Sequence, residues 1–99
     1  MEEKELFKKA IEDIDELTML FYQQKNQEGY AKLDDTLTSI SNAVDFIGRY
    51  PNQVSYPMEH INEILNAAMA SLEKKDVILL SDILLYELKT YLEKTMEAM

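Results

Sequence analysis

The chain contains no cysteine, which excludes a disulfide framework, a zinc site built on thiolates and a cysteine nucleophile. Glycine and proline are also scarce, with two residues each among 99, whereas methionine occurs six times. Because glycine and proline interrupt helices, a sequence with so few of them favours long helices joined by few turns. We therefore expect an all-α fold.

Long hydrophobic runs are missing as well. The longest runs, such as residues 77–80, have four residues, far fewer than the roughly 20 apolar residues that a membrane-spanning helix needs. Residues 1–5 are mostly charged and no apolar signal core follows them, so no secretory peptide is visible. We expect a soluble cytoplasmic protein without membrane insertion.

Basic residues are few, because ten lysines and arginines stand against nineteen aspartates and glutamates, giving a formal net charge of −9 at pH 7. A phosphate backbone repels such a chain, and the basic clusters are only the doublets Lys8-Lys9 and Lys74-Lys75. We therefore expect no nucleic-acid partner.

The length of 99 residues leaves room for a single domain, 1–99, with one core. The apolar share of 46% lies near the ordinary globular range, which argues against disorder despite the net charge. A chain this short buries a modest fraction of its surface, so its core must be used efficiently.

Helical periodicity is clear in four segments, of which the first covers residues 3 to about 25. Its apolar face is formed by Leu6, Ala10, Ile14, Leu17 and Phe21, widened by Phe7, Ile11 and Thr18. Off this face lies an acidic group that we interpret as solvated: Glu12, Asp13, Asp15 and Glu16. Asn26 and Gly29 suit the end of this helix, because both tolerate the left-handed backbone that often follows one.

The second segment starts near Tyr30 and carries a narrow apolar seam of the kind used in helical bundles. The seam consists of Tyr30, Leu33, Leu37, Ile40, Val44 and Ile47. Gly48 and Pro51 are expected to end it, since proline removes a donor and disfavours helix in the residue before it. Residues 52–56 form the longest connection, and Pro57 suits the first turn of a third helix.

The third segment carries the stripe Met58, Ile61, Leu65, Ala68 and Leu72, with Ile64 and Met69 beside it. Residues 73–76 are predicted to form a tight turn, with Asp76 as the N-cap of a fourth helix. So short a link predicts an antiparallel hairpin of the third and fourth helices.

Together the segments predict an antiparallel four-helix bundle with up-down-up-down topology. A three-helix bundle with a long first helix is the alternative. Glycine inside a helix costs only about 1 kcal/mol relative to alanine, so Gly29 need not break the first helix.

The fourth segment, residues 77 to about 96, carries apolar residues on two sides. One stripe consists of Val77, Leu84, Leu88, Tyr91 and Thr95. A rotation of about 100° per residue places Leu79, Ile83 and Tyr86 on nearly the opposite side. A helix packed on one core needs no second apolar side. This stripe therefore either meets a partner or is buried by a second neighbouring helix.

No catalytic, cofactor-binding or metal-binding residue is assigned. His60 is the sole histidine and projects away from the stripe of its helix, whereas a di-iron bundle needs two Glu-x-x-His motifs. Carboxylate pairs such as Asp34-Asp35 and Asp13 with Glu16 lie on predicted solvent faces, while general acid–base chemistry needs a desolvated acid.

Asp82 interrupts a dense apolar run on the same side of the helix as Lys89 and Glu93. We interpret it as part of a polar strip that separates two apolar faces, because an unpaired buried acid costs several kcal/mol. A buried functional acid is the competing interpretation.

Residues 73–88 resemble a segment of small uncharacterised helical proteins of Gram-positive bacteria, with the pattern K-D-x-x-L-L-x-D-x-L-x-Y-E-L. The matching positions are Lys75, Asp76, Leu79, Leu80, Asp82, Leu84, Tyr86, Glu87 and Leu88. This resemblance implies no known activity. In size, acidity and helicity the chain also resembles flagellar export chaperones, which hold an amphipathic segment of a client against an apolar helical surface.

The leading hypothesis is a non-enzymatic protein–protein interaction module, either a homodimer or an adaptor or chaperone-like protein. It buries Leu79, Ile83 and Tyr86 against a partner or a second copy, and its negative surface favours neutral or basic partners. It predicts that an Ile83→Asp variant stays folded but loses the contact. The competing hypothesis is a small enzyme or ligand binder with a polar pocket inside the bundle, lined by inward-facing Asp82, Tyr86 or Tyr91.

Overall fold

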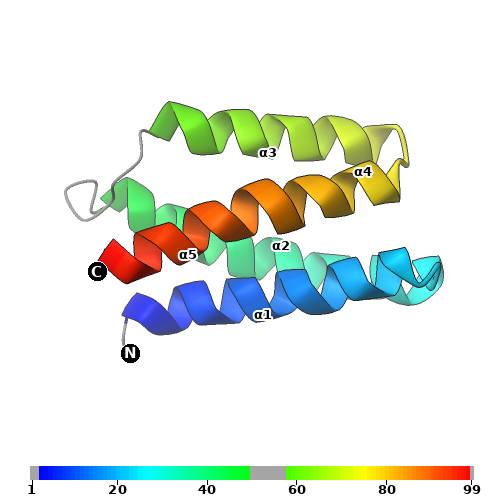
Figure 1. The fold of residues 1–99 in the computed structure, drawn as a ribbon, viewed down its shortest axis with the longest axis horizontal. Coiled ribbons are helices and arrows are strands. Elements are labelled where there is room, and N and C mark those ends of the chain that lie inside the picture. The colour runs from blue at the N-terminus through cyan, green and yellow to red at the C-terminus, as the bar shows by residue number, and fades with distance from the viewer. Residues whose placement is uncertain (1–2, 50–57, 99) are drawn as a thin grey trace.

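The computed structural model describes residues 3–49 and 58–98, which are helical apart from two short turns (Figure 1). Three helices are α1 (Glu3–Tyr22), α2 (Asn26–Arg49) and α3 (Met58–Glu73). The fourth helix is continuous and has three parts: α4 (Val77–Asp82), the π-helical segment η2 (Ile83–Leu88) and α5 (Lys89–Ala98). None of the described residues forms a strand. The prediction of an all-α fold with four helices is confirmed, and the three-helix alternative is wrong.

Successive helices run in alternating directions, as the predicted up-down-up-down topology requires (Figure 1). α2 packs chiefly against α1, and the fourth helix lies between α1 and α3. The fourth helix therefore has neighbours on two sides, which widens the arc that it buries. In the described part of the chain no helix has the length and apolar character needed to span a bilayer.

The first turn lies earlier than predicted, at residues 23–25. Gln24 takes the left-handed backbone conformation with φ 62°, and the Lys25 N–H donates to the Leu20 carbonyl. Gly29 does not end a helix but lies buried in the first turns of α2. A Cβ atom built on Gly29 would lie 2.5 Å from a ring carbon of Phe21. The glycine therefore serves the close packing of α2 on Phe21, and our interpretation of it as a stop signal is wrong.

The turn between α3 and α4 agrees with the sequence. Asp76 caps α4 by accepting a hydrogen bond from the Leu79 N–H at 3.0 Å, and Lys75 before it has φ 59°. The predicted antiparallel hairpin is confirmed. The expected connection at 52–56, with Pro51 and Pro57 on either side, lies outside the described residues.

The core is formed by apolar side chains from all the helices, and every residue of the stripe predicted for the fourth helix is buried. Phe46, which lies off the seam predicted for its helix, is also buried and meets Phe7 edge to face with ring centroids 5.7 Å apart. Buried hydroxyls on Thr18, Ser81 and Thr95 donate to the carbonyl four residues earlier, so these polar groups are satisfied.

Candidate functional site

The three residues predicted to meet a partner differ in their exposure to solvent. Ile83 is 7% exposed and belongs to the core, whereas Leu79 and Tyr86 are 45% and 68% exposed. Ile83 is buried because η2 packs against α3 as well as α1. The expected placement of all three residues on one open stripe is therefore wrong for Ile83, while Leu79 and Tyr86 face solvent.

Two polar contacts join α1 to the fourth helix. The Tyr22 hydroxyl donates to Asp82 Oδ1 at 2.5 Å, and the Lys89 ammonium donates to Asp15 Oδ1 at 2.7 Å. Tyr22 and Asp15 are seven residues apart on α1, and Asp82 and Lys89 are seven apart on the fourth helix. The two contacts therefore fix an antiparallel register. They also support the interpretation of Asp82 as part of a polar strip.

Met19 lies on α1 between the two contacts, three residues before Tyr22 and four after Asp15. Residues at these spacings share one face of a helix. Met19 therefore faces the stretch of the fourth helix between Asp82 and Lys89, which contains Tyr86. Met19 is 53% exposed and Tyr86 is 68% exposed, whereas Ile83, Leu84 and Leu88 in the same stretch are buried.

Five large apolar side chains thus gather along the junction of α1 with α4 and η2. Ile78 and Leu79 lie one turn before Asp82, which holds Tyr22, and Tyr86 lies about one turn after Asp82. Each of the five is between 40% and 68% exposed. We call them the seam patch: Met19, Tyr22, Ile78, Leu79 and Tyr86. Exposed apolar patches of this kind mark contact sites more often than single exposed residues do.

Tyr86 lies within the π-helical segment η2, where the Lys89 N–H donates to the Leu84 carbonyl five residues earlier. Short π-helical segments occur frequently at functional sites. The wider turn places one additional residue in the helix, which rotates the following residues by about 100° relative to a continuous α-helix. Nothing in the periodicity of the sequence marks this change.

The two donors of these contacts, Tyr22 and Lys89, each keep one protonation state near neutral pH. Burial raises the pKa of the Tyr22 hydroxyl, and the hydrogen bond to the Asp82 carboxylate raises it further. The hydrogen bond to Asp15 raises the pKa of Lys89, against the opposing effect of burial. Tyr22 therefore stays a neutral donor and Lys89 stays a cation, so both contacts persist.

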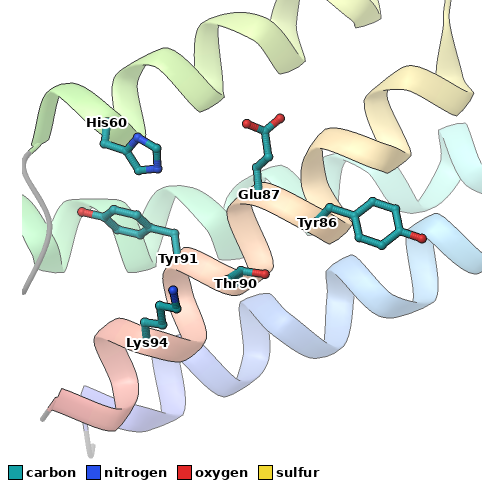
Figure 2. Close-up of a pocket in the computed structure, with 6 residues that line it drawn as sticks. All are labelled: His60, Tyr86, Glu87, Thr90, Tyr91 and Lys94. Carbon is teal, nitrogen blue, oxygen red and sulfur yellow. The ribbon is translucent and has the colours of Figure 1, made fainter.

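A shallow groove of about 190 Å³ lies beside the patch, between α3 and the fourth helix, and is lined by His60, Tyr86, Glu87, Thr90, Tyr91 and Lys94. His60 and Tyr91 face each other with ring centroids 5.8 Å apart, while the Tyr86 ring points away from them (Figure 2). His60 is exposed, as predicted. The competing hypothesis named three alternative residues for a polar pocket: Tyr91 is buried and lines this groove, whereas Asp82 is half-buried and Tyr86 is exposed. Within residues 3–49 and 58–98, no three potential metal ligands come together.

Asp13 is the polar residue that our sequence interpretation misplaced. It was expected on a solvated face, but it is 2% exposed and accepts hydrogen bonds from Ser39, Lys9 and Lys32. Asp13 follows Ala10 by three residues and precedes Leu17 by four, which is the spacing of a buried face and could have revealed it.

The Asp13 cluster lies next to a hollow of about 350 Å³ that is lined by Glu5, Leu6, Lys9, Ser39 and Asn42. Burial alone would raise the pKa of Asp13, but the three hydrogen bonds outweigh it and hold the pKa below its usual value. A carboxylate with a lowered pKa is a weak general base. The arrangement therefore holds α1 against α2 and offers little for proton abstraction.

The chain belongs to the family described as Domain of unknown function (DUF8042), whose model matches residues 2–98. No curated protein and no solved structure matches the chain. The expectation that the chain belongs to an uncharacterised family is therefore confirmed.

Proposed function

We propose that this DUF8042 chain is a non-enzymatic interaction module that binds a helix of a partner protein on the seam patch. The observation that carries the proposal is the patch itself, in which five large apolar side chains on two cross-linked helices remain open to solvent. Tyrosine and methionine, which make up three of the five, are enriched at protein interfaces.

The two polar contacts between α1 and the fourth helix hold this surface in an ordered conformation before a partner binds. Tyr22 is held by Asp82, and the backbones on both sides of Met19 are fixed by the contacts at either end. Ordering mobile side chains and loops reduces the affinity of an interface, so a surface that is already ordered loses less. Covering three or four of these side chains contributes several kcal/mol of apolar burial before the ordering cost is subtracted.

A partner protein suits the patch better than a second copy or a small ligand. Two copies of a chain with a net charge of −9 repel each other. A small ligand binds in a concave pocket, whereas the exposed Leu79 lies outside the groove that Tyr86 lines. The alternative of a small enzyme with an internal polar pocket has weaker support, because Tyr91 is buried but Asp82 is only half-buried and Tyr86 is exposed.

A chaperone-like role is the more specific form of this proposal. In that form the patch holds an amphipathic segment of a client, as flagellar export chaperones do, and the support is the resemblance in size, charge and helicity. The absence of cysteine also makes the cytoplasm the proposed location.

The experiment is an NMR titration of the labelled full chain with a neutral amphipathic helical peptide that carries leucine on one face and glutamine on the other. We expect shifts at the seam patch and about a tenfold loss of affinity in the double variant Leu79→Ser/Tyr86→Ser. Met69→Ser is the matched control. Met69 is as exposed as Leu79. It lies nine residues after His60, which is about two and a half helical turns, so it is on the opposite side of α3 from the groove that His60 lines.

Equal binding by the wild type and the double variant would overturn the assignment of the patch, and so would the absence of binding by either. Light scattering of the wild type at increasing concentration supplies the second readout. A dimer that the double variant loses would replace the partner helix with a second copy.

A further inference from the structure

The register of α1 against the fourth helix continues beyond the contact between Asp15 and Lys89. Glu12 lies three residues before Asp15 on α1, and Glu93 lies four residues after Lys89. These spacings keep both acids on the faces that carry the contact. The junction therefore has two ends, an apolar end at the seam patch and a second end at Glu12 and Glu93.

The second end is acidic. Glu12 is exposed and Glu93 is half-buried, and with Asp15 they put three carboxylates on the faces that carry the Lys89 contact, where Lys94 follows Glu93. Farther along α1, Lys8 lies 4.0 Å from Glu5, which offsets its charge. Farther along the fourth helix, Glu97 adds another exposed acid. At the apolar end, Asp82 contributes one more carboxylate beside the seam patch.

We infer that the partner helix is basic and amphipathic, and that it lies along this junction with its apolar residues on the seam patch and its lysines or arginines against Glu12 and Glu93. The inference rests on the proposed function and adds the chemistry and direction of the partner. Glu12 and Tyr22 are ten residues apart and therefore roughly 15 Å apart along α1, a distance that about three turns of a partner helix cover. The net charge of −9 attracts a basic partner at long range and repels a second copy.

The experiment uses three synthetic helices with the same leucine face and with lysine, glutamine or glutamate on the other face. Their affinities for the full chain are measured by calorimetry at low and at high salt. We expect the lysine peptide to bind most tightly, with an advantage that shrinks as salt screens the charges.

The double variant Glu12→Gln/Glu93→Gln tests whether the basic residues of the partner helix lie at this end of the junction. Its matched control is Asp34→Asn/Asp35→Asn, which removes the same charge from two exposed positions on α2. We expect about a fivefold loss of affinity for the lysine peptide in the first variant and little change in the control. Glutamine-peptide binding should remain unchanged in both.

The outcomes separate this inference from the proposed function. An equal loss in both double variants would mean that the net charge, and no particular end of the junction, attracts the peptide, which overturns the inference. Equal affinity for the lysine and glutamine peptides would overturn it as well, while leaving the proposed function in place. Binding that the Leu79→Ser/Tyr86→Ser variant retains would defeat the proposed function itself.

Discussion

Ser39 on α2 donates the hydrogen bond of its hydroxyl to Oδ2 of Asp13 on α1, a carboxylate that is 2% exposed. Lys9 and Lys32 donate to the other carboxylate oxygen at 3.0 and 3.1 Å. Each oxygen of this buried charge is therefore compensated, and the three donors come from both helices. The cluster connects α1 with α2 through polar groups, and the ion pair between Lys32 and Glu16 at 3.1 Å extends it.

Replacing Asp13 with alanine is expected to destabilise the fold by about 1 to 2 kcal/mol, because Ser39 and Lys32 lose a charged acceptor. Ser39 keeps its hydrogen bond to the Asp35 carbonyl, and Lys32 keeps its ion pair with Glu16. The free energy of unfolding, measured by urea denaturation, tests this. Glu12→Ala is the control, since Glu12 is the exposed neighbour in the same helix. Similar stabilities for the two variants would contradict the assignment of Asp13 as a buried contact.

The same cluster predicts a pH dependence. Burial raises the pKa of Asp13, but the hydrogen bonds from Ser39, Lys9 and Lys32 outweigh it and leave the pKa below its usual value of 3.8. Between the folded and the unfolded pKa the unfolded chain binds more protons, so stability rises with pH in that window. The contribution is complete above about pH 4 to 5 and is lost as the pH falls through the folded pKa.

Urea denaturation of the wild type and of Asp13→Asn between pH 2 and about pH 6 measures this contribution. The other carboxylates titrate in both proteins, so their effects cancel in the difference between the two free energies. We expect that difference to shrink as the solution becomes more acidic. A difference that is independent of pH would show that the Asp13 charge does not stabilise the fold.

The two glycines of α2 should respond in opposite ways to the same substitution. A Cβ atom on Gly29 would lie 2.5 Å from the Phe21 ring, whereas among the described residues no other group comes within 4 Å of one on Gly48. We expect Gly29→Ala to lose about 1 to 3 kcal/mol through overpacking, despite the higher helix propensity of alanine. Gly48→Ala should be neutral or more stable by about 0.5 kcal/mol. Thermal unfolding of both variants tests the pair, and a stabilised Gly29→Ala would refute the close packing.

Much of the fold could be predicted from local sequence patterns. Three-four spacing predicts the helices, and Asp76 predicts the start of the fourth, where it accepts a hydrogen bond from the Leu79 N–H. Gly29 misled the prediction, because a glycine can mark a turn or a close approach between two elements. Only the position of Phe21 in three dimensions distinguishes these uses.

The candidate site was less accessible to sequence reasoning, for two physical reasons. A helix with neighbours on two sides buries a wide arc, which places Asp13 and Ile83 inside although each looks peripheral when a single apolar stripe is assumed. The contribution of α1 is also a tertiary effect, because no local pattern connects Met19 or Tyr22 with Tyr86. The periodicity found Leu79 and Tyr86, and the packing supplied the rest of the patch.

A pair of aspartate substitutions on the fourth helix tests which of its faces is inner. Ile83 is 7% exposed, so Ile83→Asp buries a carboxylate without a partner and should destabilise the fold by at least about 3 kcal/mol. Leu79 is 45% exposed and lies in the first turn of α4, where a negative charge interacts favourably with the helix dipole. Leu79→Asp should therefore unfold at nearly the wild-type temperature.

Circular dichroism at 222 nm, followed during heating, measures both variants, and wild-type far-ultraviolet spectra provide the reference for the folded state. Loss of the cooperative transition in Ile83→Asp alone places Ile83 in the core and leaves the seam patch as the surface open to a partner. If Ile83→Asp instead melts like the wild type, Ile83 faces solvent. The fourth helix then presents the whole stripe of Leu79, Ile83 and Tyr86 outward, and the interaction surface must be redrawn toward α3.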